Sequence, residues 1–214
     1  MRILIVAPDV VGVDAVAEVR LLQSWHDVAL LHGTVTVGDV YRALQEKSYD
    51  SVYFATHGGP QGIQLSNNAV MTAEDIAQAA RQKEVRGLFF AACQTGRVAS
   101  YCVRHGVTWA INSEVDLPDD TAWKLAAAFY GQQRNGHAKD FVGAYLLADS
   151  GDGEYALHIS PLWVQDVQRS AALSVAVTPH AGMSFTKAEA LRWGLLLLTL
   201  STILSTILAR LAGG

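Results

Sequence analysis

The chain has 214 residues, of which 50% are hydrophobic and 17% are charged, and its formal net charge is −4. This balance excludes an intrinsically disordered chain, which needs low hydrophobicity and high net charge, and it argues against a nucleic-acid binder, which carries a basic excess. The two cysteines, Cys93 and Cys102, are too few for a disulfide framework. Only one apolar stretch is long enough to cross a bilayer, which excludes a polytopic membrane protein.

Short apolar runs alternate with amphipathic segments through residues 1–160. We predict strands over residues 2–7, 28–31, 51–56, 85–91, 107–111 and 155–159. We predict helices over residues 14–25, 36–47, 96–105 and 119–133, a helix that begins at Thr72, and a helical or mixed segment over 141–148. Continuous apolar strands separated by helices are typical of a mostly parallel α/β sheet with helices on both faces.

Two of the predicted strands end in residues that can do chemistry. The third strand is followed by His57, Gly58 and Gly59, and the fourth by Cys93. Functional groups lie beyond the carboxyl ends of parallel strands, and two strands joined by one helix are expected to be neighbours. A thiol just before a helix is favoured as the thiolate, and an imidazole beside it can move a proton. The amides of Gly58 and Cys93 could then form an oxyanion hole.

A structural interpretation of the same residues is also open. A cysteine at the end of a buried strand is more often a small apolar residue than a nucleophile, and a His-Gly pair after a strand can be a simple turn. The occurrence of both on consecutive strand ends favours chemistry. We expect Cys102 to be packed within its helix. The seven histidines show no metal-ligand spacing, so we predict no metal and no cofactor.

These residues resemble a known family. The stretches YDSVYFATHGGPQGIQLS and VRGLFFAACQTG look like the CHAT domains of caspase-like peptidases, and the resemblance covers residues 48–150. It implies a caspase-like three-layer αβα sandwich over residues 1–160. It also implies a cysteine endopeptidase with a His57/Cys93 dyad, in which the amides of Gly58 and Cys93 hold the oxyanion. A regulatory or defence role, in which the enzyme cleaves a protein partner, is what the resemblance suggests.

Acidic residues after two predicted strands are candidates for substrate binding. Specificity in this clan depends on the pocket for the side chain before the scissile bond. Asp9 follows the first strand, and Glu114, Asp116, Asp119 and Asp120 follow the fifth. An acidic pocket would select an arginine or lysine side chain by charge pairing. Among these residues we prefer Asp9 and Asp116 as the acids that line it. Asp119 and Asp120 can instead begin the following helix.

The C-terminal part of the chain has a different composition. Residues 161–188 read as a linker, and residues 189–210 contain the uncharged run WGLLLLTLSTILSTILA, before a short tail at 211–214. This run is short for a membrane-spanning helix unless flanking arginines snorkel, and a buried core helix is the alternative. Because the α/β domain is already complete, we expect a single-pass membrane anchor. Lys187 and Arg192 before the run, against Arg210 after it, place the catalytic domain in the cytoplasm.

The apolar run also leaves two other functions open. Its serine and threonine residues recur at four-residue spacing, which permits close helix contacts and homo-oligomers, although such hydroxyls can equally bond their own backbone carbonyls. One alternative keeps the fold without catalysis, as a membrane-tethered signalling or interaction module in which the dyad residues are a relic. The other is an effector whose oligomerising tail permeabilises the membrane. Because the helical repeats that control many CHAT domains do not precede the first strand, we expect control to come from an activating partner, from the tail or from self-association.

Overall fold

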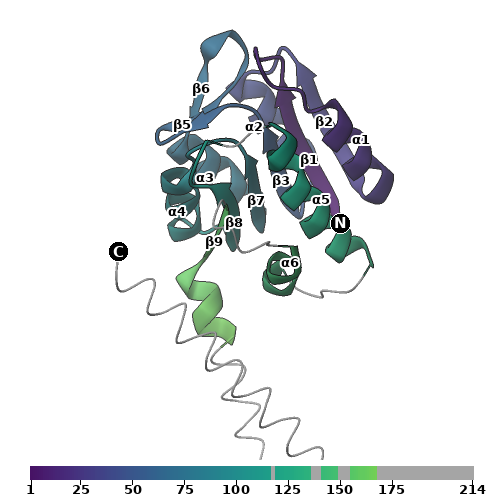
Figure 1. Cartoon of the computed structure of the whole chain (residues 1–214). Coiled ribbons are helices and arrows are strands. Elements are labelled where there is room, and N and C mark those ends of the chain that lie inside the picture. Colours follow the sequence, from purple (N-terminus) through teal and green to yellow (C-terminus); the bar gives the residue numbers. More distant parts are fainter. Residues whose placement is uncertain (117–118, 136–140, 149–154, 168–214) are drawn as a thin grey trace, which may run out of the picture. The chain divides into compact units, whose positions relative to one another are not determined.

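The computed structural model describes residues 1–116, 119–135, 141–148 and 155–167 (Figure 1). Within these residues the main sheet has six strands in the order β2-β1-β3-β7-β8-β9. Their bounds are β1 Arg2–Pro8, β2 Asp27–Gly33, β3 Ser51–Ala55, β7 Gly87–Ala91, β8 Trp109–Ser113 and β9 Tyr155–Ile159. β9 pairs antiparallel with β8, and the other pairs are parallel. The prediction of a mostly parallel sheet is confirmed.

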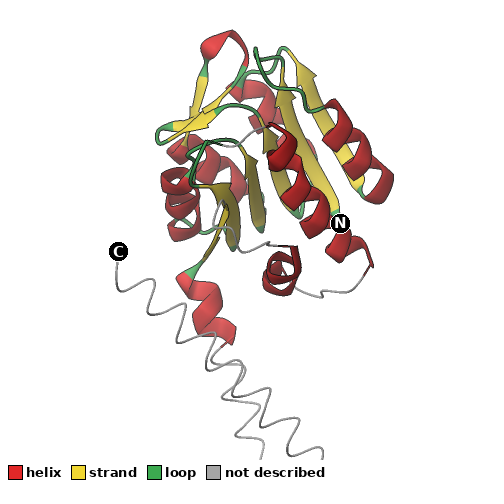
Figure 2. Cartoon of the chain, in the orientation of Figure 1, coloured by secondary structure: helices red, strands yellow, loops and turns green. Residues whose placement is uncertain are grey.

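Helices cover both faces of this sheet (Figure 2). One face is covered by α2 (Val37–Glu46), α3 (Ala73–Gln82) and α4 (Gly96–Arg104), and the other by α1 (Val16–Trp25), α5 (Asp119–Asn135) and α6 (Phe141–Ala148). Alternate strand residues enter the two cores. Leu4 and Phe54 pack with the first set of helices, whereas Ile3 and Tyr53 pack with the second. The result is a three-layer αβα sandwich, whose inner strands β1, β3, β7 and β8 are largely apolar because both of their faces are buried.

The starts of two helices are fixed by their own side chains. At α3 the Thr72 hydroxyl accepts a hydrogen bond from the Asp75 amide at 3.2 Å, and the Asp75 carboxylate accepts one from the Thr72 amide at 3.0 Å. The same reciprocal pair joins Thr36 and Asp39 at the start of α2. Each pair satisfies two backbone groups that would otherwise lack a partner. The predicted start of a helix at Thr72 is therefore confirmed.

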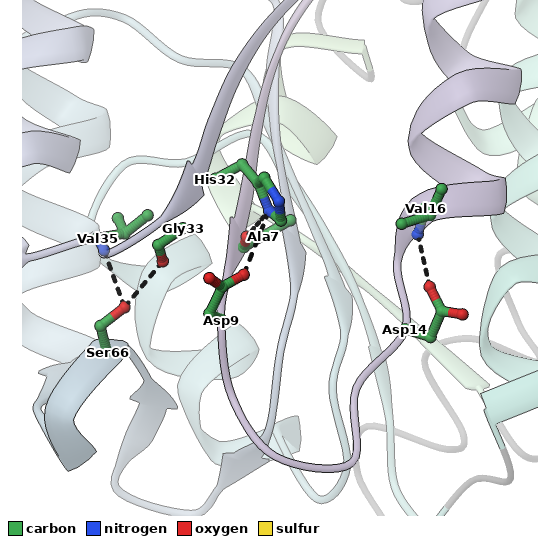
Figure 3. Close-up of polar contacts among 8 residues, drawn as sticks. All are labelled: Ala7, Asp9, Asp14, Val16, His32, Gly33, Val35 and Ser66. Atoms are coloured by element: carbon green, nitrogen blue, oxygen red, sulfur yellow. Dashed lines mark hydrogen bonds and ion pairs between the residues drawn. The ribbon is translucent and has the colours of Figure 1, made fainter.

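A second, smaller sheet follows β3 and was not predicted. Its antiparallel strands are β4 (Gly58–Gly59), β5 (Gly62–Gln64) and β6 (Val70–Thr72), with the 3-10 turn η1 (Ser66–Asn68) between the last two. The Ser66 hydroxyl attaches this sheet to the loop after β2. It accepts a hydrogen bond from the Val35 amide at 2.8 Å and donates one to the Gly33 carbonyl at 3.0 Å (Figure 3).

The described part of the chain ends in a helical segment, residues 161–167. It lies where the predicted linker begins, and the ring of Trp163 packs 4.9 Å from that of Phe141 in α6. The remainder of that linker, the predicted membrane helix at 189–210 and the tail at 211–214 lie outside the described residues. No helix in the described ranges is both long enough and apolar enough to cross a membrane.

Candidate active site

The ends of β3 and β7 lie side by side. These two strands pair in parallel from Ser51 with Gly87 to Ala55 with Ala91. His57 and Cys93 each come two residues after the last of these pairs. The chain segments that carry them therefore leave the sheet at the same edge and at the same level, as the order of elements in the sequence predicted.

Gly58 packs directly against the turn that follows β7. A Cβ atom at Gly58 would lie 2.5 Å from Cγ2 of Thr95 and 2.7 Å from the backbone oxygen of Cys93. Only glycine permits so close an approach of two backbones. Gly59 differs, because a Cβ atom there would meet nothing within 4 Å. The first glycine after His57 is thus required by its contact with the Cys93 turn.

The imidazole of His57 is exposed, and a backbone carbonyl group fixes its orientation. Its Nε2 lies 2.7 Å from the carbonyl oxygen of Val11, in the loop between β1 and α1. A carbonyl oxygen only accepts, so Nε2 carries the proton and Nδ1 is the ring atom that can take up another. The His57 carbonyl in turn accepts a hydrogen bond from the Gln64 amide at 2.8 Å. The small sheet therefore fixes the backbone of His57, and the loop fixes its ring.

Sequence analysis did not find the role of Val11, because the contact is made by a backbone carbonyl that any residue would supply. The neighbouring Gly12 was the available signal. It has a φ of +85°, and a Cβ atom there would lie 3.7 Å from Nε2 of His57. A glycine in a short loop at the end of a strand indicates a left-handed turn of this kind.

Cys93 sits on a tight turn between strand and helix. It is half-buried and forms no disulfide. Gln94 follows it with a φ of +50°, in the left-handed region that costs a non-glycine residue about 1 kcal/mol. Buried Thr95 closes the turn, since its hydroxyl donates to the Ala92 carbonyl at 3.0 Å and its amide to the Ser113 carbonyl at 3.1 Å. The N-terminus of α4 comes directly afterwards.

The structure brings one of the two preferred acids to this turn. The Gln94 amide nitrogen Nε2 donates a hydrogen bond to Oδ1 of Asp116 at 2.9 Å. Asp116 is exposed, so its carboxylate stands in solvent beside the residue that follows Cys93.

Asp9 is directed elsewhere. Its Oδ1 lies 3.6 Å from Nδ1 of His32 at the end of β2, and Figure 3 shows the two side chains facing each other. In the sheet, β2 lies on the side of β1 away from β3. Asp9 therefore points toward the outer strand rather than toward the ends of β3 and β7.

Glu114 has a structural position. A Cβ atom at Gly96 would collide with its carboxylate, which places that carboxylate over the first residue of α4. The Asn112 amide donates a hydrogen bond to Oε1 of Glu114 at 3.0 Å. The positive end of the helix dipole stabilises a carboxylate at this place. Asp119, a further candidate, begins α5.

The second cysteine is inert by comparison. Cys102 is completely buried in α4, and burial raises its pKa to about 12. The thiolate is therefore suppressed at neutral pH, as expected for a packed cysteine. Among the residues that the structure describes, no group of three or more His, Cys, Asp or Glu side chains is placed to hold a metal ion.

Comparison with known proteins gives one decisive match. The model of the CHAT domain family matches residues 12–141, which is more than half of the chain. The chain belongs to the CHAT domain family. The match begins at the glycine that lies against His57 and includes the ends of both β3 and β7. The CHAT domain is associated with caspase-like cysteine peptidases, and the helix-covered, mostly parallel sheet fits a caspase-like sandwich.

Two solved structures are distantly similar to this CHAT domain protein. The O-acetylhomoserine sulfhydrylase of Wolinella succinogenes is 16% identical with a TM-score of 0.33, over 68% of this chain and 48% of that one. The enzyme WbmG of Bordetella bronchiseptica, solved in complex with NAD, is 13% identical with a TM-score of 0.36, over 87% of this chain and 82% of that one. The chain spans about half the length of the sulfhydrylase. Neither likeness supports a functional conclusion, and no curated protein matches the chain.

Proposed function

We propose that this CHAT domain protein is a membrane-anchored cysteine endopeptidase in which Cys93 is the nucleophile and His57 moves the proton. The observation that carries the proposal is the packing of Gly58 against the backbone oxygen of Cys93. This contact joins the segments after β3 and β7 at one edge of the sheet, where the two side chains can act on one substrate. The strained turn at Gln94 and the Val11 carbonyl at His57 add support, since both fix a reacting group in place.

The reaction follows from these positions. Nδ1 of His57 first takes the proton of the Cys93 thiol, which gives a thiolate and an imidazolium. The thiolate attacks the carbonyl carbon of a peptide bond, and the amides of Gly58 and Cys93 stabilise the oxyanion that forms. When this intermediate collapses, the C–N bond breaks and His57 donates its Nδ1 proton to the leaving amine. The acyl group stays on Cys93 as a thioester. Water then gives a proton to Nδ1 and attacks the thioester, which releases the carboxylic acid and restores the thiolate.

The same His57 nitrogen performs every proton transfer in this scheme. Nε2 donates to the Val11 carbonyl throughout, so Nδ1 is the atom that exchanges its proton with the substrate and with water. The Val11 carbonyl also stabilises the imidazolium, because an oxygen dipole faces the N–H of the charged ring. No carboxylate is needed for that task.

Asp116 is the acid that we assign to substrate selection. It hydrogen bonds to Gln94 next to Cys93, and its exposed carboxylate would attract an arginine or lysine before the scissile bond. Asp9, which faces His32, is the less supported of the two predicted acids. Asp116→Asn should therefore weaken the preference for peptides with a basic residue at that position and leave the reaction with uncharged peptides unchanged.

An active-site-directed label tests the catalytic part. The full chain is incubated with a peptide acyloxymethyl ketone that carries arginine before the reactive group, and the adduct is located by mass spectrometry. We expect one adduct, on Cys93, none in Cys93→Ala, and a rate about 100-fold lower in His57→Ala. Cys102→Ala is the matched control and should react at the wild-type rate. A wild-type rate in His57→Ala would refute the dyad.

The membrane anchor is supported by the sequence of residues 193–209, and a flotation experiment tests it. The full chain should float with lipid vesicles after an alkaline wash, and a chain that lacks residues 190–214 should not. Release of a trapped dye from the same vesicles separates catalysis from permeabilisation. If the full chain and its Cys93→Ala variant release the dye equally, the tail rather than the peptidase is the effector.

A further inference from the structure

The chain leaves the sandwich at the edge opposite the candidate active site. We call the edge where the parallel strands begin the amino edge, and the edge that carries His57 and Cys93 the catalytic edge. β9 runs antiparallel to β8, pairing first with Ser113 at the catalytic edge and last with Trp109 at the amino edge. The helical segment 161–167 follows β9 and lies beyond the start of the strands, as does α6 (Figure 1).

The two edges carry charge of opposite sign. Helices α3, α4 and α5 each have an arginine in the last turn. With the adjoining loops and the segment 161–167, the basic side chains at the amino edge outnumber the acidic ones: Arg2, Lys47, Arg81, Lys83, Arg86, Arg104 and Arg134 against Asp27, Glu46, Asp50, Glu84 and Asp166. Arg2 and Asp27 form an ion pair, so the excess comes from the other residues. At the catalytic edge the acidic side chains are in excess: Asp9, Asp14, Asp39, Glu74, Asp75, Glu114 and Asp116 against Arg42 and Arg97. These charges complement the helix dipoles, and they also give a chain of net charge −4 a basic edge.

Exposed apolar side chains lie near the basic edge. Leu146 and Leu147 of α6 are 55% and 60% exposed, and Leu162 and Val167 of the segment 161–167 are 66% and 45% exposed. The two elements are joined by the ring contact between Phe141 and Trp163. Single exposed leucines are ordinary, but here four exposed apolar side chains occur on two elements that are in contact, and exposed apolar side chains that gather in this way can mark an interaction surface.

We propose that the amino edge is a docking surface for an anionic lipid bilayer. A basic excess and exposed leucines are the two components of peripheral membrane binding, and here they occur together. The chain also leaves the domain at this edge and continues to the uncharged run at 193–209, so a bilayer that holds the run keeps lipid at high local concentration near the domain. The inference rests on the membrane anchor of the proposed function. Docked in this way, the domain turns its acidic catalytic edge toward the aqueous phase.

Hydrogen exchange of the full chain in lipid nanodiscs tests the docking surface. We expect peptides from residues 81–86, 141–148 and 161–167 to exchange about fivefold more slowly in discs with phosphatidylserine than in discs of phosphatidylcholine alone. Peptides from 57–64 and 93–100, at the catalytic edge, should exchange equally in both. High salt should remove part of the difference, because it screens the lipid charge.

A pair of exposed arginines provides the variant and its control. Arg86→Glu combined with Arg104→Glu should abolish the difference between the two kinds of disc. Arg42→Glu makes the same charge change on α2, where Arg42 pairs with Asp39 near the catalytic edge, and should leave the difference intact. Because all three side chains are exposed, none of these variants is expected to affect folding.

The outcomes separate this inference from the proposed function. Equal protection of the amino edge in neutral discs, anionic discs and detergent micelles would mean that protein covers the patch, and it would overturn lipid docking. A chain that stays in the discs without any protection would overturn docking alone. A chain that does not stay in the discs would overturn both docking and the anchor. None of these results alters the labelling of Cys93, which tests the dyad independently.

Discussion

At Gly58, folding and the proposed chemistry depend on the same missing side chain. The main chain after His57 approaches the carbonyl of Cys93 so closely that even a methyl group would overlap both Thr95 and Cys93. Gly59, the next residue, has open space at the same place. The two neighbouring glycines therefore form a matched pair for measuring what this contact contributes.

Gly58→Ala should lower the free energy of unfolding by about 1–3 kcal/mol, the usual cost of overpacking. It should also slow the labelling of Cys93 at least about tenfold, because the two strand ends must separate to admit the methyl group. Urea unfolding and labelling kinetics measure the two effects. Gly59→Ala should change stability by no more than about 0.5 kcal/mol. Equal effects of the two substitutions would show that the close approach is absent in solution.

The two cysteines should differ sharply in reactivity. Cys102 is fully buried with a pKa raised to about 12, whereas Cys93 is half-buried on a surface turn. Alkylation requires the thiolate and access to it. We expect the folded chain to take up one iodoacetamide group, on Cys93, and the chain in concentrated urea to take up two, as counted by intact mass. Labelling of Cys102 in the folded state would contradict the packing of α4.

The sequence predicts those elements whose local residue pattern is compatible with only one kind of secondary structure. Strands such as β3 and β7 are apolar on both faces, and Thr72 with Asp75 marks the start of α3. The small sheet could not be predicted, because β4 consists of two glycines and its partners are three residues long. The adjacency of the chain segments that carry His57 and Cys93 followed from strand order. Their supports did not, because the Val11 carbonyl and the left-handed Gln94 are backbone features without a side-chain pattern.

The loop between β1 and α1 acts on the site through its backbone. Gly12 has a φ of +85°, which alanine adopts only at a cost of about 1 kcal/mol. Gly12→Ala should displace the neighbouring Val11 carbonyl from His57 and slow Cys93 labelling about tenfold. Gly106→Ala is the control, since Gly106 has a φ of +113° at the amino edge. It should lower stability by a similar amount without any change in labelling.

At the scale of the whole molecule, the antiparallel direction of β9 determines the edge at which the chain leaves the sheet. Had β9 been parallel to β8, the chain would have left the sheet at the edge that carries His57 and Cys93. Because β9 is antiparallel to β8, the chain leaves the sheet at the amino edge. The helix directions add to a charge separation, since α2 and α3 have acidic first turns at one edge and α3, α4 and α5 have an arginine in the last turn at the other. Under the proposed function, this topology would place the tether and the active site at opposite edges of the sheet.

Buried titratable groups in both halves of the sandwich set the pH range of stability. Burial raises the pKa of Cys102 from 9.0 to about 12, and burial together with Glu18 raises the pKa of Tyr53 well above 10.0. The unfolded chain therefore loses these protons first, and stability falls as the pH rises above about 9. Burial lowers the pKa of His26 and of His158 below 6.5, so the unfolded chain takes up protons first on the acid side, and stability falls as the pH drops through that value.

We therefore expect the urea midpoint to be highest between these limits and to decline on both sides. Each group that is ionised only in the unfolded chain contributes a slope of about 1.36 kcal/mol per pH unit. Cys102→Ala removes one such group and should make the alkaline decline shallower between pH 9 and 12 without altering the acid side, whatever its effect on stability at neutral pH. Parallel curves for the two proteins above pH 9 would mean that Cys102 ionises in the folded chain, so that the core around α4 is open to water.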